Sequence, residues 1–485
     1  MWRDLTMLVV LCGAVGVAAL RWTVVGVGPH TVLTLQAKQF LGDLVVDASA
    51  GHVYAMLYGP VGNEIQVLDG AGTARGYRFG VTNDWFVPLS VEPGTGRLYA
   101  VQPSPDRQST RVNLLDAHQG TRLATAMVPL SPNVFYPGGV AVGGGMVVLG
   151  SSGDQHCSGP WPGTCTTAGG GIAILDAASD RLRHVLHVPD GAWAVGVDAP
   201  AHHVVVAGAK GNGSPIVVRL FDAASGRLVR RTTFNAPNLI PQRMVVDGAT
   251  GRAFIAAGTL YGAFPGPTPS GAVLVLDTHT GMPVRTIALG SPVSDIAMDH
   301  TTGRVFVADR GPTRYVQKAF PSGGSMGMSM ATGVGMLHTL DARTGATIST
   351  APLGIGPGSI AVDERRGRVY VTHAGSHDGS GSSNGVTIVI AAPVAGPGGV
   401  SVVDATTGRV LRTLALGVAP ASIVLDDRTR QVFIGDGGDF MPRPPADPWA
   451  WLPAQVRRRL PFIPQTAPTA RPRPGRVLAL DASHL

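Results

Sequence analysis

Short apolar runs broken by acidic, glycine-containing turns recur along almost the whole chain. In one form, Val45-Val46-Asp47 leads through a turn at Gly51 into the apolar run Val53-Tyr54-Ala55. The same form returns at the acids Glu92, Asp247, Asp299 and Asp363. After the N-terminal region, no stretch sustains the apolar period of a helix. Short Val-, Ile- and Leu-rich runs between Gly, Asp and Pro predict many short strands and an all-β fold.

A second form of turn alternates with the first. A strand ends at an acid, and a glycine follows four residues later, at Asp116, Asp222, Asp277, Asp341 and Asp404. Across both forms, ten turns keep an acid four positions before a glycine. The carboxylate can accept hydrogen bonds from backbone N–H groups of the turn, while glycine supplies a positive φ. We therefore predict that these acids build turns and do not perform catalysis.

The two forms define a repeat of strand a, acid turn, strand b, variable loop, strand c, acid turn and strand d. We count eight copies of each form, and the last repeat stops at 480–485 without a strand d. The segment 31–35 precedes the first strand a as a strand d would, so it can complete the last repeat and close a ring. The pattern predicts a β-propeller of eight four-stranded blades, or of seven if the weak third copy is not a full blade.

Residues 303–309 (GRVFVAD) and 367–372 (GRVYVT) resemble the YVTN/YncE-type β-propeller repeat, and the resemblance covers nearly the whole chain after residue 30. Residues 404–410 (DATTGRV) also resemble the blade turn of PQQ-type eight-bladed quinoprotein propellers. The quinoprotein resemblance implies a tryptophan that docks each blade on its neighbour, but this chain has Leu411 and Arg412 there. The YVTN-like motif is specific for a fold and says almost nothing about activity.

The N-terminus carries a targeting signal. Arg3 precedes a predominantly apolar segment, Leu5 to Leu20, which Arg21 closes. Its length is typical of a secretory signal peptide, and Val24, Val25 and Val27 could extend it into an uncleaved anchor. We expect residues 1–28 to be a signal peptide or membrane anchor and residues 29–485 to form the propeller. Either alternative places the protein outside the cytoplasm.

Charge argues against a nucleic-acid partner. The formal net charge is +7, but charged residues make up only 14% of the chain, and the basic excess is scattered arginine. No stripe of Lys and Arg interleaved with aromatic residues is present in the sequence. We expect no nucleic-acid binding, and we expect a monomer.

Cys157 and Cys165 lie eight positions apart in a segment rich in Gly, Pro, Ser and Thr. In an exported protein two such cysteines favour a local disulfide, with two free thiols as the alternative. A disulfide closing so short a loop is worth about 2–3 kcal/mol in the chain-entropy model.

Length varies mainly in the loops between strands b and c. All b–c loops open on the face opposite the acid turns, so we expect long insertions to cap one end of the central channel. Loops held by a rigid scaffold commonly carry function, although neutral drift on a tolerant surface would give the same pattern. The long insertions are 151–170, 258–271, 310–335, 373–398 and 437–475.

Candidate metal ligands lie in two of these insertions and, for His338, shortly after the first of them. Their thioethers and imidazoles suit Cu(I), which prefers soft donors, although methionine is also adaptable apolar filler. Copper is therefore the one cofactor that the residues suggest. The candidate ligands are Met326, Met328, Met330, His338, His373 and His377.

The proline-rich insertion 437–475 contains aromatic residues beside three consecutive arginines. Such a segment could lie on an anionic membrane surface, bind a partner or pack within the cap. Its candidate contact residues are Trp449, Trp451, Arg457, Arg458 and Arg459.

Two functions fit the sequence. The first is a non-enzymatic extracytoplasmic binding or scaffold propeller, whose capped face meets a protein or cell-envelope ligand. The alternative is a metal- or cofactor-dependent oxidoreductase or hydrolase, copper-containing or quinoprotein-like, at the channel mouth. No catalytic acid–base pair can be named, so the scaffold with no coherent catalytic set favours the first.

Overall fold

The computed structural model describes residues 29–482 apart from several short gaps and one long one. The gaps are 37–38, 48–49, 60–62, 70–73, 79–88, 93–94, 105–108, 117–118, 120, 132–136, 159–163, 212–213, 237, 260–269, 320–324, 376–379, 384–385, 390–397, 417–419 and 437–473. The described elements are β-strands, which form eight four-stranded antiparallel sheets and three separate two-stranded hairpins. The predicted all-β propeller with eight blades is thus confirmed.

The first four blades follow one another along the chain. Blade 1 contains β2 (Phe40–Asp47), β3 (His52–Tyr58), β4 (Glu64–Asp69) and β5 (Ala74–Arg78). Blade 2 contains β6 (Leu89–Glu92), β7 (Arg97–Pro103), β8 (Thr110–Asp116) and β9 (Arg122–Val128). Blade 3 contains β10 (Pro137–Gly143), β11 (Met146–Ser151), β14 (Gly171–Asp176) and β15 (Leu182–His187). Blade 4 contains β16 (Ala194–Asp198), β17 (His203–Gly208), β18 (Ile216–Asp222) and β19 (Leu228–Phe234).

The other four blades repeat this order. Blade 5 contains β20 (Leu239–Asp247), β21 (Arg252–Thr259), β22 (Gly271–Asp277) and β23 (Pro283–Leu289). Blade 6 contains β24 (Val293–Asp299), β25 (Arg304–Asp309), β28 (Val334–Asp341) and β29 (Thr347–Ile355). Blade 7 contains β30 (Pro357–Asp363), β31 (Arg368–His373), β34 (Gly399–Asp404) and β35 (Val410–Ala415). Blade 8 contains β36 (Pro420–Asp426), β37 (Gln431–Asp436), β38 (Arg476–Asp481) and β1 (His30–Thr34).

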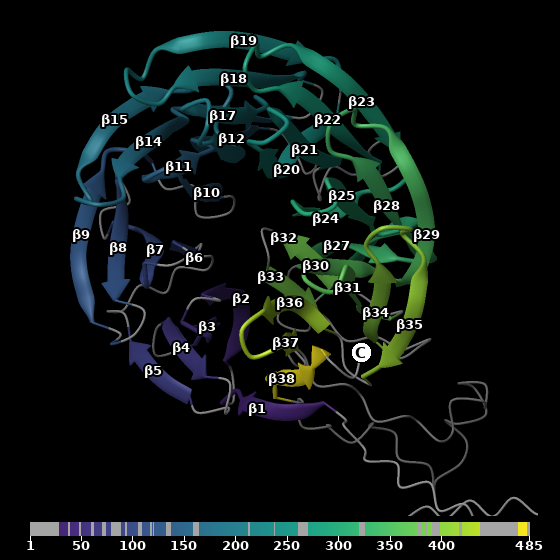
Figure 1. The fold of residues 1–485 in the computed structure, drawn as a ribbon. Coiled ribbons are helices and arrows are strands. Elements are labelled where there is room, and N and C mark those ends of the chain that lie inside the picture. Colours follow the sequence, from purple (N-terminus) through teal and green to yellow (C-terminus); the bar gives the residue numbers. More distant parts are fainter. Residues whose placement is uncertain are drawn as a thin grey trace, which may run out of the picture.

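The inner strands of the eight blades form a closed ring (Figure 1). Each inner strand contacts the inner strand of the next blade, in the order β2, β6, β10, β16, β20, β24, β30 and β36. The last contact, between β36 and β2, joins the two ends of the array. The weak third copy of the repeat is a complete blade, which decides for eight blades over seven.

The N-terminal strand closes the ring as the sequence predicts. β1 pairs antiparallel with β38, with His30 opposite Ala479 and Thr34 opposite Arg476. The Leu35 N–H donates to the Gly475 carbonyl at 2.9 Å and extends the pairing by one residue. Blade 8 therefore combines strands from the two ends of the described chain, and β38 keeps no open edge.

An aromatic residue near the start of strand b joins many of the blades to their neighbours. Phe254 of blade 5 packs with Val305 and Val307 of blade 6, and Phe433 of blade 8 packs with Leu41 of blade 1. These aromatic side chains are essentially inaccessible to solvent, so each removes a large apolar surface from water. The same position carries Tyr54, Tyr99, Phe306 and Tyr370 in blades 1, 2, 6 and 7.

The repeated acids build turns, as predicted. In the turn after β34, Asp404 Oδ1 accepts the N–H of Thr407 at 2.8 Å, and the Gly408 N–H donates to the Asp404 carbonyl at 2.8 Å. Gly408 has φ of 69°, which only glycine adopts without strain. The Thr407 N–H and hydroxyl bonds lower the pKa of Asp404, against a smaller opposing effect of burial. These bonds occupy the carboxylates and leave them a structural role.

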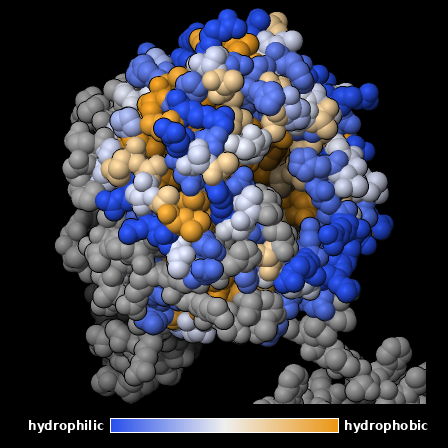
Figure 2. All heavy atoms as spheres, turned by 60° about the vertical axis from the view of Figure 1, so that its left-hand side comes forward, coloured by the Kyte–Doolittle hydropathy of each residue, from blue (hydrophilic) through white to orange (hydrophobic). Residues whose placement is uncertain are grey.

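The outer strands are mostly exposed (Figure 2). Apolar side chains are scattered among hydrophilic ones on this rim, and arginines such as Arg230 and Arg231 stand beside exposed Leu228 and Val229. Charged side chains on an exposed edge strand oppose pairing with another sheet. Leu411 is also 39% exposed, so no side chain docks between blades at the position of the quinoprotein tryptophan.

Candidate functional site

Three of the long b–c insertions contain hairpins on the face opposite the acid turns. They are β12 (Asp154–Ser158) with β13 (Thr164–Ala168), β26 (Thr313–Ala319) with β27 (Ser325–Ala331), and β32 (Ser380–Ser383) with β33 (Val386–Val389). β33 of blade 7 contacts β2 of blade 1, and β27 of blade 6 contacts β32. The blade 7 hairpin therefore extends past blade 8 toward the ring axis (Figure 1).

A charged pair lies on the inner strands beneath these hairpins. The Nε atom of Arg243, in β20, is 3.4 Å from Oδ1 of Asp295, in β24. Asp295 also accepts the N–H of Ile296 at Oδ1 and the N–H of Ile360 at Oδ2, each at 2.9 Å. The carboxylate thus links blades 5, 6 and 7 and is only 8% exposed. The arginine side chain is 40% exposed although it stands on an inner strand.

Asp43, in β2 of blade 1, interacts electrostatically with this pair, although blade 1 lies four blades from blade 5 around the ring. Burial raises the pKa of Asp43 to about 6, with Arg243 lowering it and Asp295 raising it. The Leu44 N–H donates to its Oδ1 at 3.0 Å. Among the described residues Asp43 and Arg243 form no ion pair within 4.0 Å. The carboxyl is therefore only partly compensated by the guanidinium.

The sequence carries a positional signal for this cluster, although no motif predicts it. Asp43, Arg243 and Asp295 each stand four residues before the acid that ends their strand a. The pairing with strand b shifts register beside all three residues, which marks a β-bulge at the same height in blades 1, 5 and 6. Bulges re-aim side chains and are common beside functional sites. A charge at a repeated bulge position in an otherwise apolar strand indicates a side chain turned to the axis.

His338 was predicted as a metal ligand, and the structure gives it a carboxylate partner. It lies on β28, and its Nε2 is 2.7 Å from Oδ2 of Asp309 at the end of β25. Asp309 Oδ1 accepts the N–H groups of Gly311 at 2.8 Å and Met336 at 3.2 Å. The pair anchors the two ends of the blade 6 insertion to each other.

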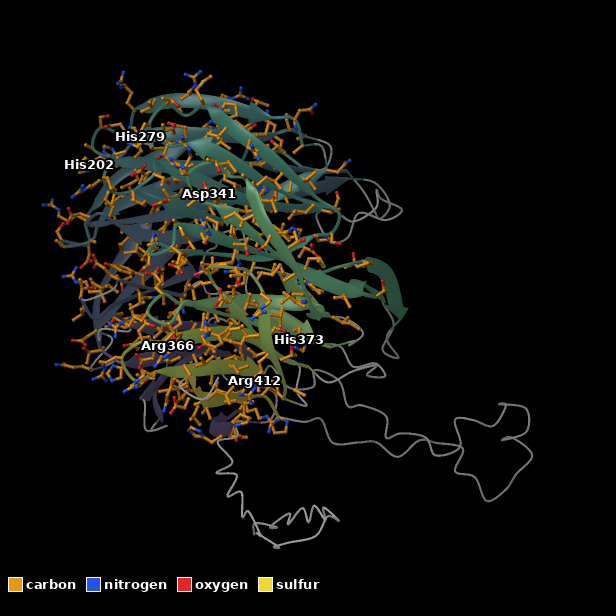
Figure 3. The ribbon with its side chains drawn as sticks, turned by 45° about the vertical axis from the view of Figure 1, so that its right-hand side comes forward. His202, His279, Asp341, Arg366, His373 and Arg412 are labelled. Atoms are coloured by element: carbon orange, nitrogen blue, oxygen red, sulfur yellow. The ribbon has the colours of Figure 1, made fainter. Side chains whose placement is uncertain are left out.

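His373 lies at the base of the blade 7 insertion, toward the face opposite the turn residues His202, His279 and Arg366 (Figure 3). Its ring packs against Gly354 of β29 and Gly399 of β34, where a Cβ atom would lie within 3.0 Å of it. The residue is 5% exposed, and neither ring nitrogen has a hydrogen-bond partner among the residues that the structure describes. Burial lowers the pKa of His373, so the imidazole is neutral at pH 7.

The structure places the remaining predicted metal ligands only in part. Met326, Met328 and Met330 occupy alternate positions of β27, opposite Lys318, Val316 and Arg314, so this segment is a strand of a hairpin and not an irregular loop. His377 lies outside the described residues. Within the described part of the chain, no three His, Cys, Asp or Glu side chains are grouped to hold a metal ion. Convergence of the six predicted ligands stays a prediction.

Cys157 and Cys165 lie directly opposite each other in the hairpin β12–β13. Residues opposite each other in an antiparallel pair have Cα atoms about 4.5–5.5 Å apart, within the range of a disulfide. The backbone register is therefore compatible with the predicted bond.

The predictions for the two least regular segments are not tested. Residues 1–28 and the surface residues Trp449, Trp451, Arg457, Arg458 and Arg459 lie outside the described residues. Within the described part, no helix has the length and apolarity to cross a membrane.

No protein-family model and no curated protein sequence matches the chain. Solved structures do resemble its fold. A europium-containing methanol dehydrogenase superposes with a TM-score of 0.50 and 13% identity over 93% of each chain. The quinohemoprotein alcohol dehydrogenase ADHIIG from Pseudomonas putida HK5 has a TM-score of 0.50 and 14% identity, over 92% of this chain and 75% of that chain. Hydrazine synthase from Kuenenia stuttgartiensis has a TM-score of 0.46 and 13% identity, over 75% and 96%.

At 13–14% identity these likenesses support the propeller fold and do not transfer an activity. Membership in the YVTN/YncE repeat family is not confirmed by them.

Proposed function

We propose that the protein is a non-enzymatic binding propeller outside the cytoplasm, and that its ligand docks on the face of the b–c insertions, at the mouth of the axis. The contact of β33 with β2 carries this proposal, because it brings an insertion over inner strands that hold partly compensated charges. The turn face offers less, since hydrogen bonds within each turn occupy its repeated carboxylates.

A photo-crosslinking amino acid at Val334 tests which face binds a partner. Val334 begins β28 on the insertion side and is 49% exposed. We expect in-cell irradiation to join this position to one envelope protein or glycan. The matched control carries the same amino acid at Arg343, which is exposed in the acid turn between β28 and β29. Adducts from Arg343 alone, or equal adducts from both positions, would reject the insertion face.

A soft-metal site at His373 is the second candidate. Gly356 packs between Ala374, next to His373, and Ala331, at the end of the methionine-bearing β27, since a Cβ there would lie 3.8 and 3.5 Å from their Cβ atoms. The backbone thus brings the end of β27, where Met330 precedes Ala331, close to the residue that follows the neutral imidazole of His373. Imidazole and thioether together suit Cu(I).

We expect the purified protein to withdraw one equivalent of Cu(I) from bicinchoninate. His373→Phe should weaken this by about tenfold or more, because one ligand is lost. His338→Gln serves as the control and should retain the metal, since His338 is already bonded to Asp309. Failure of the wild type to compete, or equal competition by His373→Phe, would refute the site.

The quinoprotein alternative has weaker support. One structural neighbour is a europium-containing methanol dehydrogenase, and another is a quinohemoprotein. The described axis residues Asp43, Arg243 and Asp295 supply two carboxylates beside a guanidinium, and no metal-holding group is found in the described part. Asp295 is already engaged by Arg243 and by two backbone N–H groups, so these three residues leave one carboxylate, Asp43, for a hard cation that takes six to eight oxygen ligands. On that ground they do not fit a metal-assisted quinone site, and we derive no chemical step through a quinone.

A further inference from the structure

We propose that Asp43, Arg243 and Asp295 form a subsite for the paired ammonium and carboxylate groups of a free amino acid. The proposal rests on the proposed function, because it places the ligand on the ring axis beneath the β32–β33 hairpin. It assigns the ligand class from the arrangement of three side chains that come from blades 1, 5 and 6.

Arg243 would bind the carboxylate. Asp295 holds its Nε, and two backbone N–H groups hold Asp295 in turn, so the guanidinium plane is oriented. The Nη groups of Arg243 have no partner among the described residues, and 40% of the side-chain surface is exposed to solvent. A planar guanidinium with a free edge binds a carboxylate through two parallel hydrogen bonds.

Asp43 would bind the ammonium. Arg243 and Asp295 form a pair of opposite charges, which leaves Asp43 with the uncompensated negative charge of the cluster. Asp43 and Arg243 act on each other electrostatically, yet no ion pair within 4.0 Å joins them, so they are separate charged groups on the inner strands of blades 1 and 5. A simple anion would meet two carboxylates, and a simple cation would meet the guanidinium. A zwitterion satisfies both charged groups.

Binding should depend on pH through Asp43. The charged groups that act on it are Arg243 and Asp295 from the opposite inner strands. Its carboxyl must be ionised to hold an ammonium, so affinity should fall as the pH drops through about 6. Folding stability changes in the opposite direction. Because the folded pKa is raised from 3.8, the stability contributed by the protonated group is lost as pH rises from about 4 through about 6.

Calorimetric titration of the purified full chain with each of the standard amino acids, singly, tests the ligand class. At pH 7.5 we expect at least one to bind, and its amide and its N-acetyl derivative to bind about tenfold more weakly or not at all. These derivatives remove the carboxylate and the ammonium in turn. No binding of any amino acid at about 10 mM, or equal binding of the N-acetyl derivative, would overturn the proposal.

Variants test the residues. Asp43→Asn should lose about tenfold or more in affinity at pH 7.5 and should lose the pH dependence of binding. Its urea midpoint at that pH should equal or exceed that of the wild type, which separates loss of binding from loss of fold. Ser422→Ala changes the matching bulge position in blade 8 and should bind normally. Unchanged amino-acid binding by Asp43→Asn would refute the subsite. The proposed function would still stand in that case if the crosslink from Val334 to a partner is observed.

Discussion

A chain that begins at residue 37 is expected to be less stable than one that begins at residue 29 by about 3–5 kcal/mol and to aggregate. The shorter chain lacks β1, whose backbone bonds to β38 and whose Leu35, 3% exposed, packs into the core around Phe433 and Val477. Without β1, the edge of β38 is open to pairing with another molecule. Urea denaturation and light scattering of the two chains measure the effect.

Moving residues 29–36 to follow Leu485 provides the matched control. His30 lies opposite Ala479, near the end of β38, so the relocated segment can return along β38 as a strand d. The relocated chain should recover most of the lost stability and remain monomeric. If the chain beginning at residue 37 denatures at the same urea concentration as the longer one, the closure by β1 does not stabilise the ring.

Arg219→Met is expected to destabilise the protein by about 3–5 kcal/mol. Arg219, in β18, forms an ion pair with Asp190 in the connection between blades 3 and 4, and both side chains are 8% exposed. Removal of the guanidinium leaves a buried carboxylate without its counter-charge, which costs far more than loss of a surface ion pair. The urea midpoint should fall well below that of the wild type.

The double variant Arg219→Met with Asp190→Asn separates charge from packing. It removes the uncompensated charge and should recover about half or more of the lost stability. A double variant as unstable as Arg219→Met would show that the arginine acts through its packing in blade 4. The half-buried pair Arg304 and Asp341 lies at the surface with an N–O distance of 3.5 Å, and it is a control whose loss should cost less than about 1 kcal/mol.

The turns and the repeating blades could be predicted because their causes are local, although the choice of eight blades over seven needed the structure. An acid, a glycine and the four-residue spacing between Asp404 and Gly408 bring together the donor, the acceptor and the positive φ of a turn within one short segment. The missing last strand could be predicted too. A closed ring of similar repeats leaves one strand d position empty, in the last blade, and residues 31–35 occupy it. Even the degenerate third copy forms a full blade, since its short apolar runs persist where its turn acid is missing.

The candidate site could not be predicted in the same way. Asp43 and Arg243 are 200 positions apart in sequence, and only closure of the ring brings them within electrostatic reach. Residue type suggests His338 as a metal ligand, whereas only the structure shows that its Nε2 lies 2.7 Å from Asp309 Oδ2, and its role as a ligand stays a prediction. A residue type shows what chemistry is possible, whereas its neighbours decide whether its polar atoms are already occupied.

The sequence by itself determined the repeated strands, the acid turns, the closed propeller ring, the strand that closes it and the face on which the insertions lie, and the structure decided for eight blades over seven. Each depends on interactions that repeat every blade and extend over a few residues. Only the tertiary structure decided that β33 reaches β2, that Arg243 and Asp295 share the axis with Asp43, and that His373 is buried without a partner. These features depend on contacts between different blades, and a closed ring alone brings such distant positions to one axis.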